Sequence, residues 1–229
     1  MTAFIERVDR APTQRFWKLK YAVERVIATV AFLASLPLFI LLAIAIKASS
    51  AGPILYVSER LGRNGRTFRL LKFRSMKVGV EAILGPDGKV LTIVDDPRAT
   101  PIGRFLRLGF DELPQLINVI RGEMCLVGPR PDVTTELERY TPRQRERLEV
   151  LPGITGLAAV VGGRFMCNAD NYELDVVYVR ESSFFTDCKI LLLTVPYSLG
   201  WEKIGAWVFQ DILQRVKENT RALGNAIST

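Results

Sequence analysis

The run Val26–Ile46, with the sequence VIATVAFLASLPLFILLAIAI, decides how this chain is built. It contains 21 residues without a charge, and the sequence holds no second run of this kind. About 20 apolar residues are enough for a helix to cross a bilayer. The run is longer than the apolar core of a typical secretory signal, and no small-residue cleavage site follows it. The sequence therefore predicts a helical membrane anchor.

Positive charge flanks this run on both sides. Because cations favour the cytoplasmic side, a spanning helix would leave one of the two flanks on the wrong side of the membrane. Both flanks lie on the cytoplasmic side if the chain enters and leaves through the same leaflet. The cations lie before the run at Arg7, Arg10, Arg15, Lys18, Lys20 and Arg25, and after it at Lys47, Arg60, Arg63, Arg66 and Arg69.

Pro37, in the middle of the run, favours such a re-entrant path. Proline removes a helical hydrogen bond and clashes with the preceding turn, so it produces a kink. Each half would hold about ten residues, or roughly 15 Å of helix, which is half of a hydrocarbon core of about 30 Å. The hydroxyl of Ser35 can bond a backbone group freed at the bend. We favour a re-entrant helix hairpin over residues 20–47, broken at Pro37; a kinked spanning helix is the alternative.

A pair of carboxylates, Asp111 and Glu112, opens the stretch Asp111-Glu112-Leu113-Pro114-Gln115. The protein has no histidine, so proton transfer, nucleophilic attack or metal binding falls to carboxylates, cysteines, hydroxyls or lysines. Pro114 suits the first turn of a helix over about 113–120. This places the pair near a helix N-terminus, where backbone amides also stabilise bound phosphate. A helix cap with a first-turn acid is the purely structural alternative.

Composition indicates one sizeable domain plus an additional element. The chain has 229 residues, 48% of them hydrophobic, and a formal net charge of +7. This charge favours phosphorylated small molecules, anionic lipid headgroups or nucleic acid as partners. The cysteines Cys125, Cys167 and Cys188 form neither close pairs nor a metal-binding spacing, which indicates a reducing cytoplasm.

The rest of the chain predicts an α/β fold that is rich in helix and has short strands. Glycines at 62 and 65 suggest a hairpin between two strands. A C-terminal amphipathic helix over about 201–221 suits either a membrane interface or packing on its own domain. The strands are expected over about 54–57 and 67–73, further helices near 100, 142–150 and 172–179, and turns at 85–88 and 152–156.

This pattern divides the chain into successive segments. Residues 1–19 form an N-terminal cytoplasmic segment, 20–47 the membrane helix, 48–195 a catalytic domain and 196–229 a C-terminal amphipathic segment that is a candidate for the membrane interface.

Several cations are candidates for binding phosphate. Arg130 lies between Pro129 and Pro131, which limit the local backbone, and its guanidinium matches phosphate oxygens in a bidentate manner. Lys72 and Arg74 alternate along the predicted strand, so both would share one face and meet a diphosphate or a lipid phosphate. Solvated surface positions are the alternative for these residues.

Taken together, the motifs of this chain resemble those of the bacterial sugar transferases, small monotopic phosphoglycosyl transferases that act on polyprenol phosphate. The resemblance runs from about Lys20 to about Leu193. The blocks that carry it are Gly52-Pro53, Arg60-Leu61-Gly62-Arg63-Asn64-Gly65, Lys72-Phe73-Arg74-Ser75-Met76, Asp111-Glu112-Leu113-Pro114-Gln115-Leu116, Gly128-Pro129-Arg130-Pro131 and Pro152-Gly153-Ile154-Thr155-Gly156-Leu157.

The resemblance implies an enzyme on the cytoplasmic face of the bacterial inner membrane. Such an enzyme transfers a sugar-1-phosphate from a UDP-sugar to undecaprenyl phosphate and releases UMP, as the first membrane step in making exopolysaccharide, capsule or O-antigen. Asp111 would be the nucleophile of an aspartyl-phosphosugar intermediate, and Glu112 with Asp111 would hold Mg²⁺. Inner-leaflet phospholipid is then a partner and nucleic acid is not, while a homodimer is left open.

The chain also departs from the family pattern. The segment Arg104–Phe110 is one residue shorter than usual, which affects whether Arg107 reaches the substrate phosphate. A usual Lys-Arg-x-x-Asp opening retains here only Lys20 and an acid, Glu24. Asp175 lies in a block shared with the family and is a candidate accessory residue, with a structural pairing to an arginine as the alternative.

Two other functions remain open at this point. A non-enzymatic, membrane-anchored basic protein would bind anionic lipid or nucleic acid, and a phosphatase would act on the same lipids. Against the first, the motifs are blocks of carboxylates and glycines rather than runs of cations. The sequence does not identify the transferred sugar.

Overall fold

The computed structural model describes residues 12–81, 83, 96–161, 168–198 and 203–227. It confirms a helix-rich fold with short strands. The helices are α2 (Gln14–Ser49), α3 (Pro101–Leu106), α4 (Gln115–Arg121), α5 (Leu157–Val161), α6 (Asn168–Glu181), α7 (Phe184–Ser198), α8 (Lys203–Val208) and α9 (Gln210–Ile227). The strands are β1 (Leu55–Leu61), β2 (Thr67–Phe73), β3 (Cys125–Val127) and β4 (Gly153–Thr155), and 3₁₀ turns occur at η1 (Arg63–Gly65), η2 (Phe110–Glu112), η3 (Thr134–Glu138) and η4 (Gln144–Glu149).

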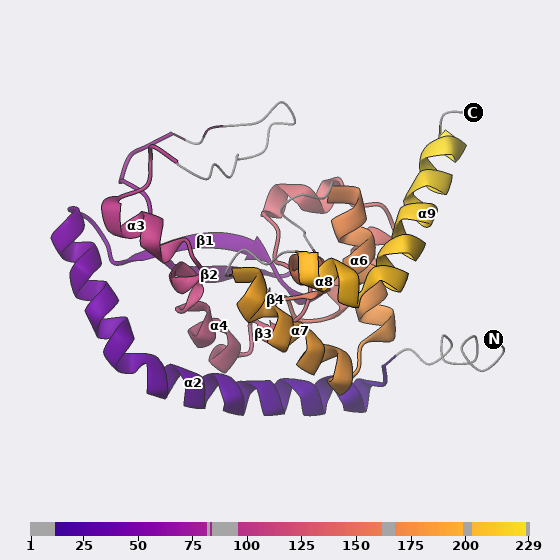
Figure 1. The fold of residues 1–229 in the computed structure, drawn as a ribbon, viewed down its shortest axis with the longest axis horizontal. Helices are drawn as coiled ribbons and strands as arrows, with labels where there is room; N and C mark the ends of the chain where they lie inside the picture. The colour runs from indigo at the N-terminus through magenta and orange to yellow at the C-terminus, as the bar shows by residue number, and fades with distance from the viewer. Residues whose placement is uncertain (1–11, 82, 84–95, 162–167, 199–202, 228–229) are drawn as a thin grey trace.

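Helix α2 is one continuous helix of 36 residues that contains Pro37. It runs along one edge of the molecule and curves around the left side in Figure 1, so the chain bends without separating into two antiparallel halves. The Ser35 hydroxyl donates to the carbonyl of Phe32 at 3.0 Å, one residue before the carbonyl that Pro37 leaves without its usual donor. Ser35 therefore bonds a neighbouring carbonyl rather than the group freed by Pro37, and a hairpin is not seen.

One side of α2 packs on the protein and the other side is apolar and exposed. Ala28, Leu42 and Ile46 are buried, whereas Val26, Val30, Leu41 and Ile44 are each more than half exposed. Within the described residues, α2 is the one helix long and apolar enough to cross a membrane, judged by length and composition. An apolar surface of this kind is uncommon in a monomer in water and common at a membrane.

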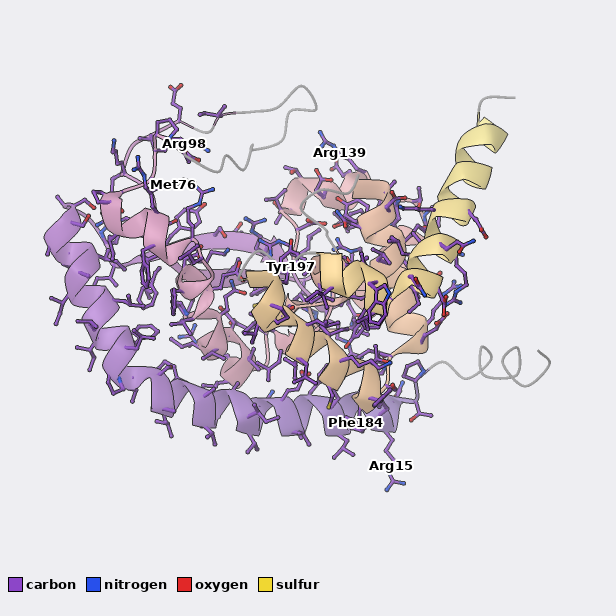
Figure 2. The ribbon with its side chains drawn as sticks, in the orientation of Figure 1. Arg15, Met76, Arg98, Arg139, Phe184 and Tyr197 are labelled. Atoms are coloured by element: carbon purple, nitrogen blue, oxygen red, sulfur yellow. The ribbon has the colours of Figure 1, made fainter. Side chains whose placement is uncertain are left out.

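Buried charges fix α2 to the rest of the molecule. Lys20, which is 1% exposed, bonds Glu24 and donates to Asp187 of α7 at 2.9 Å. Glu24 also accepts from the backbone N–H of Leu126 in β3 at 3.0 Å. At the start of α2, Phe16 contacts Phe184 edge to face, and Figure 2 shows Phe184 at the same end of the molecule as Arg15.

Strands β1 and β2 form the predicted antiparallel hairpin, with Tyr56 opposite Lys72 and Arg60 opposite Phe68. Asn64 in the turn has a φ of 58°, a left-handed conformation that asparagine tolerates. Helix α4 packs on β2 through Asn118. Its amide donates to the Arg69 carbonyl at 2.8 Å, and its carbonyl oxygen accepts from Leu71 N–H at 3.1 Å.

The second half of the chain surrounds the parallel pair β3–β4, in which Cys125 lies opposite Gly153. Helices α5, α6 and α7 pack around this pair, and α9 crosses α6 (Figure 1). The main core joins both halves of the chain; among its buried members are Phe68, Leu116, Val127, Leu157, Leu174 and Ile190. Val216 of α9 is 1% exposed, so α9 packs on the domain at this position, whereas Trp207 of α8 is 72% exposed.

Several expected elements differ in the structure. The helix expected over 142–150 is the 3₁₀ turn η4, the turn expected at 152–156 contains β4, and the single C-terminal helix is divided into α8 and α9. Helix α4 begins at Gln115, so Pro114 is its cap rather than part of its first turn. Helix α7 is not among the expected elements. The expected turn at 85–88 lies outside the described residues.

We predict that Asn118→Ala lowers the free energy of unfolding by about 2 kcal/mol, because it leaves Leu71 N–H and the Arg69 carbonyl buried without a partner. For a protein of this size, the unfolding temperature should fall by roughly 4–8 °C. Thermal unfolding of the purified protein in detergent measures the change. The exposed Gln214, whose amide bonds Glu218 on the surface, provides the control: Gln214→Ala should leave the unfolding temperature unchanged. A stable Asn118→Ala protein would contradict the role of Asn118.

Candidate active site

The turn η2 presents the two carboxylates. It begins after Gly109, whose φ of 117° suits glycine and strains other residues. Phe110 is half-buried and stacks on the exposed Phe105, with ring centroids 4.9 Å apart. The Phe110 ring and Leu113 pack on the apolar cluster around Phe73 and Leu106. The side chains of Asp111 and Glu112 are mostly buried but not sealed from solvent, being 15% and 23% exposed.

Lys72 of β2 bridges the carboxylates. Its ammonium nitrogen lies 2.6 Å from Oε1 of Glu112 and 3.8 Å from Oδ2 of Asp111. Two contacts fix the backbone that carries Lys72 and so direct its side chain toward the carboxylates. Strand β2 is paired with β1, and the neighbouring Leu71 N–H is bound by Asn118. The structure thus brings together Lys72, Asp111 and Glu112, which are separated along the chain.

Arg130 completes the group from another direction. It follows β3 in the loop Gly128–Pro131, and its Nη2 lies 3.7 Å from Oε1 of Glu112. Its side chain is 64% exposed, so the contact with Glu112 leaves most of the guanidinium accessible to a bound anion.

The two carboxylates differ in acidity. Burial raises the pKa of Asp111, an effect that the charge of Lys72 only partly offsets. Burial acts in the same direction on Glu112, but the charges of Lys72 and Arg130 and hydrogen bonds from Lys72 and Gln115 outweigh it and lower the pKa of Glu112. Glu112 therefore retains its charge more strongly than Asp111.

Arg74 does not join this group. It is 5% exposed, and its guanidinium donates to the carbonyl of Ser50 at 2.7 Å, to the Ser50 hydroxyl at 3.0 Å and to the carbonyl of Ala51. The expectation that Arg74 shares a phosphate with Lys72 is therefore not supported. β2 ends at Phe73, and the following residue turns its side chain to the end of α2.

Arg107 also has a contact away from the carboxylate pair. Its Nη1 lies 3.3 Å from Oδ2 of Asp96, which is fully buried and is bound at 2.6 Å by Nη2 of Arg98. Hydrogen bonds from Arg98 hold the pKa of Asp96 well below its usual range. Figure 2 shows Arg98 beside Met76, next to the bridge between Met76 and Ala99 that leads into α3. Arg107 thus ties α3 to this segment, and its contact with substrate stays a prediction.

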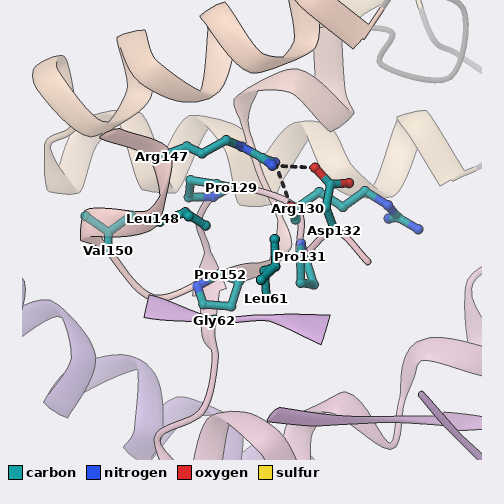
Figure 3. Close-up of a pocket in the computed structure, with 10 residues that line it drawn as sticks. All are labelled: Leu61, Gly62, Pro129, Arg130, Pro131, Asp132, Arg147, Leu148, Val150 and Pro152. Atoms are coloured by element: carbon teal, nitrogen blue, oxygen red, sulfur yellow. Dashed lines mark hydrogen bonds and ion pairs between the residues drawn. The ribbon is translucent and has the colours of Figure 1, made fainter. Parts of the chain in front are cut away.

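Asp175 pairs with an arginine, which is the structural alternative to an accessory role in the site. It is buried in α6 and accepts from Nε and Nη2 of Arg147 at 3.0 and 2.6 Å. Arg147 in turn contacts the Arg130 loop behind a small pocket of about 10 Å³, which Figure 3 shows between β1 and η4. Asp175 therefore touches the site only through Arg147.

Two further residues belong near the site and were not singled out from the sequence. Burial and the positive charge of Arg130 lower the pKa of Arg60 of β1. Gln115, which is 3% exposed, bonds Glu112. The spacing of Gln115 three residues after Glu112 is a usable signal, since such pairs meet on a helical turn.

The carboxylate pair also fits a magnesium ion. Both carboxylates face one cationic group, the Lys72 ammonium, so both are near enough to each other to bind a single metal cation. Mg²⁺ commonly binds through one or two carboxylates, substrate phosphates and water. Among the described residues no group of three or more acidic, cysteine or histidine ligands occurs.

Comparisons with known proteins agree with these motifs. A profile of the family described as bacterial sugar transferase matches residues 14–200. The chain is 39% identical to the exopolysaccharide production protein ExoY of Rhizobium meliloti, over 77% of this chain and 84% of that protein. It is 40% identical to the UDP-glucose:undecaprenyl-phosphate glucose-1-phosphate transferase of Escherichia coli, over 77% of this chain and 39% of that protein.

A further relative is the galactosyl transferase CpsE of Streptococcus agalactiae, 44% identical over 65% of this chain. The chain spans about a third of CpsE, 35% of its length. The matched region contains the turn with Asp111 and Glu112, the strand with Lys72 and the loop with Arg130. This chain belongs to the bacterial sugar transferase family.

Proposed function

We propose that this protein is a phosphoglycosyl transferase that moves a sugar-1-phosphate from a UDP-sugar to polyprenol phosphate and releases UMP. The observation that carries the proposal is the convergence of Asp111 and Glu112 on Lys72, with Arg130 beside them. Names of relatives support the substrates: one is a UDP-glucose:undecaprenyl-phosphate glucose-1-phosphate transferase, and another an exopolysaccharide production protein.

In the first step the Asp111 carboxylate attacks the β-phosphorus of the UDP-sugar. A bond forms between the carboxylate oxygen and phosphorus, the bond to the bridging oxygen breaks, and UMP leaves. The product on the protein is an acyl phosphate that carries the sugar. Lys72 and Arg130 neutralise the phosphate oxygens, which lowers the repulsion that an anionic nucleophile meets.

In the second step an oxygen of polyprenol phosphate attacks the same phosphorus and displaces Asp111. That oxygen is already anionic near neutral pH, so the step needs no strong general base. This agrees with a protein that contains no histidine. A magnesium ion held by Asp111 and Glu112 would supply charge neutralisation on the diphosphate.

The path of α2 supports placement of both of its ends on one side of a membrane. The N-terminal half of α2 is tied to β3 and α7, and its C-terminal end packs against Phe73 and Leu106. A helix that crossed a core of about 30 Å would separate its two ends, whereas both ends of α2 contact the same globular unit. We therefore propose that the exposed side of α2 enters one leaflet, where Asp111 meets both lipid and nucleotide substrates.

We predict that Asp111→Asn lowers turnover by roughly a thousandfold or more, since it removes the nucleophile. Glu112→Gln should nearly abolish turnover, and excess chelator should do so in the wild type because Mg²⁺ is removed. The measurement is UMP release from a panel of UDP-sugars with undecaprenyl phosphate. Substantial transfer by pure Asp111→Asn protein would overturn the assignment, and release of inorganic phosphate instead of UMP would indicate a phosphatase.

The pH profile provides a second prediction. The pKa of Asp111 is raised, and the nucleophile is lost as pH falls through that pKa, so the acid limb of kcat/KM should lie above the ordinary pKa of aspartate, about 3.9. Lys72→Met removes the positive charge that partly offsets the raised pKa of Asp111, so the acid limb of kcat/KM should move to higher pH. Lys77, whose ammonium bonds the Pro97 carbonyl, is the control, and Lys77→Met should leave the limb in place. An unshifted limb in Lys72→Met would contradict the arrangement.

Membrane topology can be tested by cysteine labelling. In a protein with Cys167 and Cys188 replaced by serine, Arg15→Cys and Glu59→Cys place thiols at exposed positions before and after the apolar run. An impermeant maleimide should label neither in spheroplasts and both in inverted membrane vesicles. Labelling of one position from the periplasmic side would show that α2 spans the membrane.

A further inference from the structure

The loop that carries Arg130 is held through its carbonyl groups. Pro129 and Pro131 have no backbone N–H, so this part of the loop has few donors of its own. The Pro129 carbonyl accepts from Gly153 N–H at 2.8 Å, and the Asp132 carbonyl accepts from Leu61 N–H at 2.8 Å. The carbonyl of Arg130 itself accepts from a side chain, Nη2 of Arg147, at 2.7 Å.

Arg147 is fixed on every side. It is 3% exposed, and Asp175 of α6 takes its Nε and Nη2 at 3.0 and 2.6 Å. Its Nη1 donates to Asp132 and to the hydroxyl of Tyr140. The guanidinium also lies over the rings of Tyr140 and Tyr172, at 5.3 and 4.7 Å from their centroids. A side chain held in this way is a rigid support for the loop.

The backbone carbonyl and the side chain of Arg130 point in different directions, so a contact that holds the carbonyl also orients the side chain. Figure 3 shows the carbonyl of Arg130 facing Arg147, while the Arg130 side chain extends away from it. The guanidinium of Arg130 reaches Glu112 at 3.7 Å. Arg130 is mostly exposed, so its own side-chain contacts do little to hold it. Its position relative to the carboxylates is therefore set largely through the backbone.

We propose that Arg147 is a positioning residue that fixes the Arg130 loop so that the Arg130 guanidinium meets the diphosphate of the substrate. The proposal rests on the proposed function, because it assigns Arg130 to substrate phosphate. Arginine is needed at position 147, since only its planar fork serves Asp175, Asp132 and the Arg130 carbonyl at once. Lysine keeps the charge and loses this geometry.

The test compares Arg147→Lys with Arg180→Lys. Arg180 of α6 binds Glu146 of η4 through two hydrogen bonds of 2.7 Å. The control thus breaks a bidentate pair between the same two elements without touching the Arg130 loop. Arg147→Lys should raise KM for the UDP-sugar roughly tenfold with a smaller change in kcat, whereas Arg180→Lys should change neither. Tyr140→Phe, which removes one partner of Arg147, should act in the same direction with a smaller effect.

A double-mutant cycle separates positioning from a general loss of structure. If Arg147 acts through Arg130, Arg147→Lys should have no further effect on kcat/KM in an Arg130→Gln background, within about twofold. A loss that persists in that background, or an equal loss in Arg180→Lys, would overturn the proposal.

Hydrogen exchange provides a readout that needs no activity. Backbone amides in the segment 125–133 should exchange faster in Arg147→Lys than in the wild type or in Arg180→Lys. Equal exchange would overturn the proposal even if activity fell. A wild-type protein that releases no UMP from any UDP-sugar would instead defeat the proposed function, and the exchange result would still decide whether Arg147 holds the loop.

Discussion

The structure depends on a buried ion cluster that fastens α2 to the globular part of the protein. Lys20 is held by Glu24 and Asp187, Glu24 also accepts from the backbone of β3, and Asp187 accepts from the hydroxyl of Tyr178 at 2.6 Å. Buried charges are tolerated only when paired, and removing one partner typically costs about 3–5 kcal/mol. Because β3 leads directly into the Arg130 loop, the cluster that positions α2 also determines where the site lies relative to the exposed apolar side of that helix.

In the candidate site, the positive charge of Lys72 is shared unequally between the two carboxylates. Lys72 is closer to Glu112 than to Asp111, at 2.6 against 3.8 Å. The pKa of Glu112 is lowered and that of Asp111 is raised. Two carboxylates whose surroundings move their acidities apart are suited to different roles. Asp111, less tightly paired, is the better candidate for a nucleophile, and Glu112, which stays charged, for holding a cation. The exposed guanidinium of Arg130 remains available to a diphosphate.

Local features were predictable from the sequence, and long-range partners were not. The hairpin of β1 and β2 and a helix near residue 100 follow from local turn and helix-start residues. The motif blocks single out Lys72 and the carboxylates, but their contact appears only in the structure. The partners of Arg74 and Arg107 depend on how α2 and the segment before α3 pack, which no local pattern contains. The β3–β4 pair joins segments far apart in the chain, and α7 carries the run Ile190–Thr194 with little polar face, so its period is weak.

The central claim is that Asp111 becomes covalently linked to a sugar phosphate. Its most direct test is mass spectrometry of the protein after rapid quenching with a UDP-sugar that supports transfer, in the absence of polyprenol phosphate. We expect a peptide containing Asp111 that is heavier by one sugar phosphate, a mass that is lost when polyprenol phosphate is added and is absent from Asp111→Asn. Transfer to lipid with no such adduct, and with UMP released only when both substrates are present, would contradict this claim.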